Sequence, residues 1–141
     1  MRVREGVLDK LKAFPWREWG VEYALLFGSA VKGVVYRDVD IAVKFKRYSF
    51  EGYAELLAAL ASHLRVREDH IDLVPLNRED LPAVLVLEIY TKGVLVYCED
   101  KEAFLDEAFR RINLSYDFLI DSRKLGLVEE AVRAVKRKWG L

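Results

Sequence analysis

Two aspartates, Asp38 and Asp40, stand one residue apart in the apolar stretch DVDIAV, residues 38–43. In an extended strand the side chains alternate between faces, so both carboxylates project to one side while Val39 projects to the other. Like charges so close together resist joint ionisation. A divalent cation between them, typically Mg²⁺ with oxygen ligands and bound phosphates, keeps both groups ionised. The pair therefore predicts a metal site.

A glycine-serine turn precedes this pair. The apolar run YALLF, residues 23–27, predicts a buried strand that ends at Gly28 and Ser29, where the chain must bend and start a short helix through Gly33. Backbone amides and the local dipole at a helix start attract phosphate. The Ser29 hydroxyl can add a hydrogen bond, and Lys32 adds positive charge. The turn is thus a candidate phosphate site beside the metal pair.

A third carboxylate, Asp72, lies in the short apolar run HIDLVPL, residues 70–76. An ionised side chain within a predicted buried strand is costly without a partner or a task. Three converging carboxylates suit two-metal phosphoryl or nucleotidyl transfer, in which the ions hold a triphosphate and lower the pKa of an attacking hydroxyl. Asp72 is expected nearest to that hydroxyl.

In this order and strand context, Gly28, Ser29, Asp38, Asp40 and Asp72 resemble the signature of minimal nucleotidyltransferases of the DNA polymerase beta superfamily. The resemblance covers nearly the whole chain. After the third acid the family runs through an Asn-containing loop and a helix to a Gly turn and a last strand, and this sequence follows the same course up to Asp100.

The resemblance implies an α/β (α+β) fold, with a short mixed sheet flanked by helices and a C-terminal helical extension. We expect a single nucleotidyltransferase domain over residues 1–141, with a catalytic core at about 1–98 and a C-terminal helical segment at about 101–139.

The activity implied by the resemblance is Mg²⁺-dependent transfer of AMP from ATP to a hydroxyl. Many of these small proteins are antitoxins encoded beside a HEPN-domain ribonuclease toxin, which they silence by modifying a tyrosine of the toxin. The expected partners are thus ATP, two Mg²⁺ ions and a HEPN toxin. The catalytic and metal-binding residues would be Asp38, Asp40 and Asp72, and the nucleotide-binding residues Gly28, Ser29 and Lys32.

Two other functions stay open. The protein could neutralise its HEPN partner by stoichiometric contact without catalysis, or it could transfer nucleotides to a small molecule or RNA. Enzymes of that last kind usually carry extra substrate-binding domains, for which this chain has little length to spare.

The sequence departs from the family pattern in the loop between the turn and the acid pair. Eight residues, 30–37, separate Ser29 from Asp38, where ten are more usual. Arg37 stands where a small Ser commonly precedes the first acid, and Lys32 where Arg is frequent. All three acids are present, so retained activity is expected, with an altered geometry over the phosphates.

Composition favours one globular domain. The chain has 141 residues, of which 52% are hydrophobic, and 23 basic residues balance 23 acidic ones. There is therefore no global basic field of the kind that drives nucleic-acid binding. A single cysteine, Cys98, excludes an internal disulfide, and no apolar run suits a signal peptide or a membrane span. A cytoplasmic protein is expected, and association with itself or with its toxin stays open.

Apolar spacing predicts alternating helices and strands around the candidate site. Ser49 is the predicted N-cap of a crossover helix that leads to the Asp72 strand. The other predicted elements are a helix over residues 3–14 stopped near Pro15, a helix ending at Gly93, a strand over 94–98, and helices over 101 to about 123 and 127–138.

The long apolar face after residue 101 has two interpretations: packing on its own sheet, which we favour, or contact with a second chain. Trp16, Trp19 and Trp139 are expected to fill the core. His63 and His70 are expected to be surface or packing residues. Cys98 and the two histidines form no metal-ligand cluster, which disfavours a structural zinc site. Val34 and Val35 replace the Lys and Ser or Thr of a P-loop, which disfavours a Walker-type ATPase.

Overall fold

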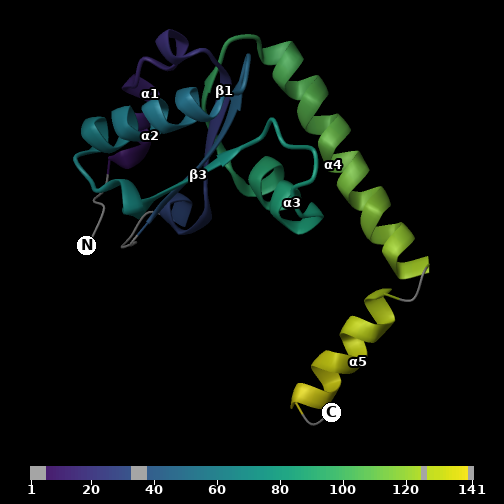
Figure 1. Ribbon diagram of the computed structural model, residues 1–141. Coiled ribbons are helices and arrows are strands. Elements are labelled where there is room, and N and C mark those ends of the chain that lie inside the picture. Colours follow the sequence, from purple (N-terminus) through teal and green to yellow (C-terminus); the bar gives the residue numbers. More distant parts are fainter. Residues whose placement is uncertain (1–5, 33–37, 125–126, 140–141) are drawn as a thin grey trace.

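The structure, a computed structural model, describes residues 6–32, 38–124 and 127–139 (Figure 1). It contains the helices and strands that the apolar patterns predict. In chain order they are α1 (Val7–Ala13), η1 (Trp16–Trp19), β1 (Val21–Phe27), η2 (Gly28–Lys32), β2 (Val39–Phe45), α2 (Phe50–Leu64), η3 (Glu68–His70), β3 (Ile71–Pro75), α3 (Ala83–Lys92), β4 (Val94–Cys98), α4 (Lys101–Lys124) and α5 (Leu127–Trp139).

The four strands form one mixed sheet in the order β3-β2-β1-β4. β1 is antiparallel to both β2 and β4, whereas β2 and β3 are parallel. Parallel neighbours cannot be joined by a tight turn, and α2 makes the crossover between them. The predicted α/β fold with a short mixed sheet, flanking helices and a C-terminal helical extension is confirmed.

Helices α1 and α2 cover one face of the sheet (Figure 1). Their apolar residues, including Leu11, Leu56 and Leu60, pack against alternate strand residues of β1 and β2. The predicted cap of α2 is confirmed, because the Ser49 hydroxyl accepts a hydrogen bond from the backbone amide of Gly52 at 2.9 Å. This satisfies one of the unpaired amides in the first turn and defines where the helix begins.

Helix α3 and the first half of α4 pack on the opposite face, over β1. Phe104 and Ala108 of α4 and Ile89 of α3 bury the other set of alternating strand residues. Arg111 of α4 is 3% exposed, and its guanidinium donates hydrogen bonds to the backbone carbonyls of Leu76 and Arg78. These bonds hold the loop between β3 and α3 against α4.

The second half of α4 extends away from the sheet and leads to α5 (Figure 1). The prediction that the apolar face of this helix packs on its own sheet is therefore right only for its first turns. Four exposed apolar residues recur at spacings of four and seven and so share one face of the helix; we call Leu105, Phe109, Tyr116 and Ile120 the exposed patch of α4. None of the described helices is both long and apolar enough to cross a bilayer.

The three tryptophans have different environments. Trp16 is 1% exposed, and its indole donates a hydrogen bond to the carbonyl of Leu11 at 2.7 Å. Trp19 is partly buried against the same core. Trp139 is 70% exposed, so the prediction of core filling is wrong for this residue. It lies on α5, which extends beyond the sheet and therefore has no core to fill (Figure 1).

Asn77 holds β3 beside β2. Its side-chain oxygen accepts from the amide of Phe45 and its side-chain nitrogen donates to the carbonyl of Phe45, both at 2.9 Å. The amide of Leu76 also donates to the carbonyl of Val43 at 2.8 Å. A slip of one residue would turn every side chain of a strand to the other face. These hydrogen bonds therefore fix the register that places Asp40 and Asp72 side by side.

Candidate active site

The three predicted acids meet on adjacent strands at one end of the sheet. Asp40 lies in β2, paired across the sheet with Phe27 of β1 on one side and with Asp72 of β3 on the other. Asp38 immediately precedes β2 and is two residues from Asp40, so it shares its face. This is the face on which α3 and α4 lie, whereas the intervening Val39 enters the core under α2.

Asp72 is exposed, which corrects the expectation of a buried third acid. The strand that carries it, β3, is at the edge of the sheet. On this face α3 contacts chiefly β1 and α4 contacts chiefly α3, so the Asp72 side of the sheet is left open. A carboxylate in this position is available to a ligand that approaches from solvent.

The Gly28 turn lies directly against Asp40. Gly28 has φ of +73°, a conformation that L side chains rarely adopt, and a Cβ placed there would overlap the Asp40 carboxylate. The chain then forms the 3₁₀ turn η2, in which Ser29 is exposed and Ala30 is buried. Only a glycine allows the backbone of the predicted phosphate turn to approach the acid so closely.

Part of the predicted phosphate loop lies outside the described residues. Lys32 ends η2, but its side chain is not among those described. The predicted continuation through Gly33, most of the short loop and the position of Arg37 likewise fall outside the described residues.

The electrostatics of the site favour a cation. Burial, followed by the negative charges of Asp72, Asp38 and Glu88, raises the pKa of Asp40 from 3.8 to about 6. All of these causes act against the charged form, and nearby positive charge would oppose them and favour ionisation of Asp40. Glu88 lies on α3 and brings a fourth carboxylate toward the group.

The chemistry of these donors fits Mg²⁺. The ion prefers carboxylate oxygens and keeps several water or phosphate ligands, which suits a site that is open on one side. Within the described parts of the chain, no group of three His, Cys, Asp or Glu side chains is arranged closely enough to hold a metal ion as it stands. The Asp38 carboxylate is in contact with His70, with Oδ1 at 3.3 Å from Nδ1.

His70 and Glu88 are site residues that the sequence reasoning missed. His70 was expected to be a surface or packing residue, yet it faces Asp38 across the β2–β3 pair. Its position two residues before Asp72, at the start of the run that the sequence predicts as a strand, was a usable signal. No sequence signal pointed to Glu88, because its approach to Asp40 depends on how α3 packs on the sheet.

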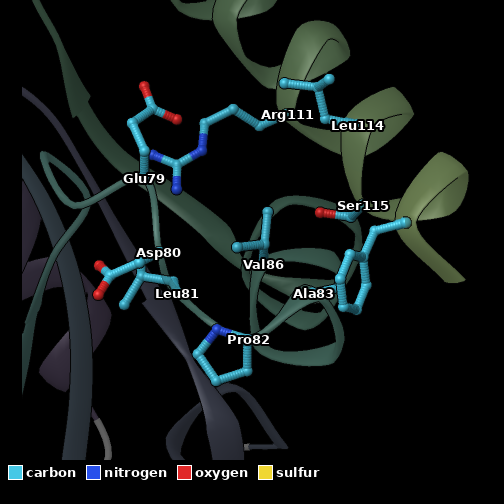
Figure 2. Close-up of a pocket in the computed structure, with 10 residues that line it drawn as sticks. Glu79, Asp80, Leu81, Pro82, Ala83, Val86, Arg111, Leu114 and Ser115 are labelled. Carbon is cyan, nitrogen blue, oxygen red and sulfur yellow. The ribbon is translucent and has the colours of Figure 1, made fainter. Parts of the chain in front are cut away.

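A separate hollow lies between the loop that precedes α3 and helix α4 (Figure 2). It has a volume of about 390 Å³, and its lining includes Leu81, Val86, Arg111 and Ser115. The Ser115 hydroxyl points into it from α4 (Figure 2). None of the three aspartates lines this hollow, so it is distinct from the candidate active site.

Comparison with known families identifies the fold. Residues 9–102, well over half of the chain, match the family model described as "Polymerase beta, Nucleotidyltransferase". The chain belongs to this family. The prediction of a nucleotidyltransferase of the polymerase beta superfamily is thereby confirmed. No curated protein matches the chain.

Solved structures of toxin–antitoxin complexes share the polymerase beta nucleotidyltransferase fold of this chain. One is a tri-AMPylated Shewanella oneidensis HEPN toxin in complex with MNT antitoxin, with a TM-score of 0.65 and 22% identity over 89% of this chain and 96% of that one. A toxin–antitoxin complex with AMP-PNP has a TM-score of 0.66 and 23% identity over 90% and 97%. The MntA-HepT toxin–antitoxin has a TM-score of 0.61 and 20% identity over 89% and 93%. At these identities the likeness establishes the fold.

Proposed function

We propose that the chain is a Mg²⁺-dependent nucleotidyltransferase that transfers AMP from ATP to a tyrosine hydroxyl of a cognate HEPN-domain toxin, and that it acts as the antitoxin. The observation that carries the proposal is the position of Asp40, between Asp38 and Asp72 and against the Gly28 turn. Membership of the nucleotidyltransferase family supports the chemistry. The AMPylated toxin and the AMP-PNP complex among proteins of this fold support the substrate and acceptor.

Each residue has a defined task in this proposal. The amides of the Gly28 turn and the exposed Ser29 hydroxyl donate hydrogen bonds to the phosphates of ATP, and Lys32 adds positive charge. Asp38, Asp40 and Asp72 would hold the two metal ions. When bound, Mg²⁺ supplies charge neutralisation at the phosphates and at the attacking oxygen.

The transfer step balances without a further reactant. The tyrosine oxygen attacks the α-phosphorus of ATP, a new phosphorus–oxygen bond forms, and the bond to the β-phosphate breaks so that pyrophosphate leaves. The proton of the tyrosine hydroxyl passes to the Asp72 carboxylate, which is exposed on the open side of the sheet. Asp72 therefore acts as the base in this proposal, in addition to its place among the three metal-binding acids.

The exposed patch of α4 supports a protein partner. Its four large apolar residues, on one face of the helix, are between 40% and 62% exposed. Contiguous exposed apolar surface is uncommon on a monomer and typically marks an interface. Binding of a HEPN partner along α4 would cover it. The patch also fits the competing function, an antitoxin that neutralises its toxin by contact alone.

The test is incubation of the purified protein with Mg²⁺, ATP and a co-encoded HEPN protein, followed by intact mass analysis of both chains. The proposal requires the partner to gain one or more AMP units. The variant Asp38→Asn/Asp40→Asn should abolish this gain and leave the folded state intact. Asp9→Asn is the matched control, because Asp9 is an exposed acid on α1, which covers the other face of the sheet.

Two outcomes would contradict the proposal. A stable complex with no change of mass would favour a binding antitoxin. Transfer of AMP to a small molecule or RNA, with no modification of the protein partner, would assign the third function.

A further inference from the structure

His70 lies opposite Asp38 because of the parallel register of β2 and β3. The strands pair Val39 with Ile71 and Asp40 with Asp72, so the preceding residues, Asp38 and His70, face each other on the same side. His70 Nδ1 is 3.3 Å from Asp38 Oδ1. The two side chains therefore contact each other at the open end of the candidate metal site.

The two partners are not equally constrained. The Asp38 side chain is 56% exposed, whereas that of His70 is only 21% exposed. Asp38 precedes β2, whose pairing with β3 begins at Val39, so the backbone of Asp38 is outside the paired strand. His70 ends the turn η3, where its amide donates to the carbonyl of Arg67 at 3.0 Å. His70 is thus the better-anchored member of the pair.

The direction of the hydrogen bond follows from the groups involved. An ionised carboxylate has only acceptor atoms, so the proton must lie on Nδ1 of His70. This bond fixes both the tautomer of the imidazole and the orientation of the Asp38 carboxylate. Such outer contacts hold the ligands of a metal in a productive geometry, and their loss typically weakens metal binding.

We propose that His70 is a positioning residue, which orients Asp38 by its Nδ1–H bond and thereby strengthens divalent-metal binding at the active site. The inference rests on the proposed function, in which Asp38 is a metal ligand. In this role His70 does not itself ligate the metal. Its effect is on the affinity of the site for the ion, so saturating metal should restore turnover when His70 is replaced.

The test compares His70→Asn with His70→Leu, in direct titrations that follow the electron paramagnetic resonance signal of free Mn²⁺. The Asn side chain can place an N–H donor near the position of Nδ1, whereas Leu cannot. We expect Leu to weaken Mn²⁺ binding by roughly 10- to 100-fold and Asn to retain most of the affinity. Transfer by the Leu variant should recover as Mg²⁺ is raised, with kcat little changed.

His63→Leu is the matched control. His63 bonds to the carbonyl of Lys10 and packs against Phe14, on the other face of the sheet. Its loss should lower the free energy of unfolding without changing Mn²⁺ affinity. Thermal unfolding of all variants separates metal binding from folding.

Three results would overturn the inference. Wild-type affinity in His70→Leu would show that the contact does not position Asp38, and the proposed function would stand. A nitrogen hyperfine coupling to bound Mn²⁺ that disappears in His70→Leu would make His70 a metal ligand instead. Absence of Mn²⁺ binding by the wild-type protein would refute the proposed metal site and this inference together.

Discussion

Replacement of Gly28 by Ala tests the close approach between the phosphate turn and the metal pair. Two separate penalties are expected. The φ of +73° costs an L residue about 1–2 kcal/mol, and the added Cβ would overlap the Asp40 carboxylate. Overpacking of this kind typically costs about 1–3 kcal/mol more. The expected total loss in the free energy of unfolding is therefore about 2–5 kcal/mol if Asp40 keeps its position.

Gly20→Ala isolates the first penalty. Gly20 has a similar φ of +67°, but a Cβ there would have no neighbour within 4 Å. Its substitution should therefore cost only the conformational part, about 1–2 kcal/mol. The difference between the two variants measures the collision with Asp40, and urea denaturation of both proteins in the absence of metal gives it directly.

The Asp40 side chain could avoid the collision by rotating away. The extra loss of stability would then be small, but the displaced carboxylate would no longer bind metal, so Mn²⁺ affinity and AMP transfer should fall sharply. In an Asp40→Ala background the carboxylate is gone, and the extra cost of Gly28→Ala over Gly20→Ala should largely disappear. The reasoning is refuted if Gly28→Ala matches Gly20→Ala in stability and the wild type in both metal affinity and transfer.

Three further predictions concern other parts of the molecule. Arg111→Met, which removes both bonds to the loop before α3, should lower the free energy of unfolding by about 2–4 kcal/mol, whereas the exposed Arg110→Met should change it by less than about 0.5 kcal/mol in the same denaturation assay. Burial and neighbouring carboxylates raise the pKa of Asp40 from 3.8 to about 6, so the folded protein binds the proton of the Asp40 carboxyl more tightly than the unfolded chain does. The free energy of unfolding should therefore fall as the pH rises from about 4 to about 6. Asp40→Asn should flatten this loss and stabilise the metal-free protein at pH 7 by about 1 kcal/mol after allowance for solvent screening, and equal pH profiles for the two proteins would contradict the assignment. Phe109→Glu, in the exposed patch of α4, should weaken partner binding at least about tenfold in calorimetry with little effect on folding. The control Phe50→Glu, at a residue that is 76% exposed at the start of α2, should bind the partner normally.

The elements of the fold were predictable from local patterns. The period of the apolar residues located the four strands and the described α-helices, but not η1 or η3, and Ser49 marked the start of α2, because both signals act over a few residues. The wrong predictions depended on distant packing. Trp139 is exposed because α5 leaves the core, and Asp72 is exposed because its strand is at the sheet edge. The division at about residue 98, the cytoplasmic location and the oligomeric state stay predictions.

For the candidate site, too, some features could be predicted from the sequence and others required the folded structure. Its residue types and their alternation along each strand were legible in the sequence, since a period of two places Asp38 and Asp40 on one face. Their assignment as metal and nucleotide ligands stays a proposal. The contact of His70 with Asp38, the charge of Glu88 near Asp40 and the backbone of Gly28 against that carboxylate required the folded chain.

By itself, the sequence determined which groups could do chemistry and which strands and turns carry them, because both follow from residue type and short-range spacing. Only the tertiary structure decided which groups face each other. The parallel register of β2 and β3, which the hydrogen bonds of Asn77 to Phe45 stabilise, places Asp40 beside Asp72 and Asp38 beside His70. Such pairings join residues about thirty positions apart, and no local pattern specifies the register between two strands separated by a helix.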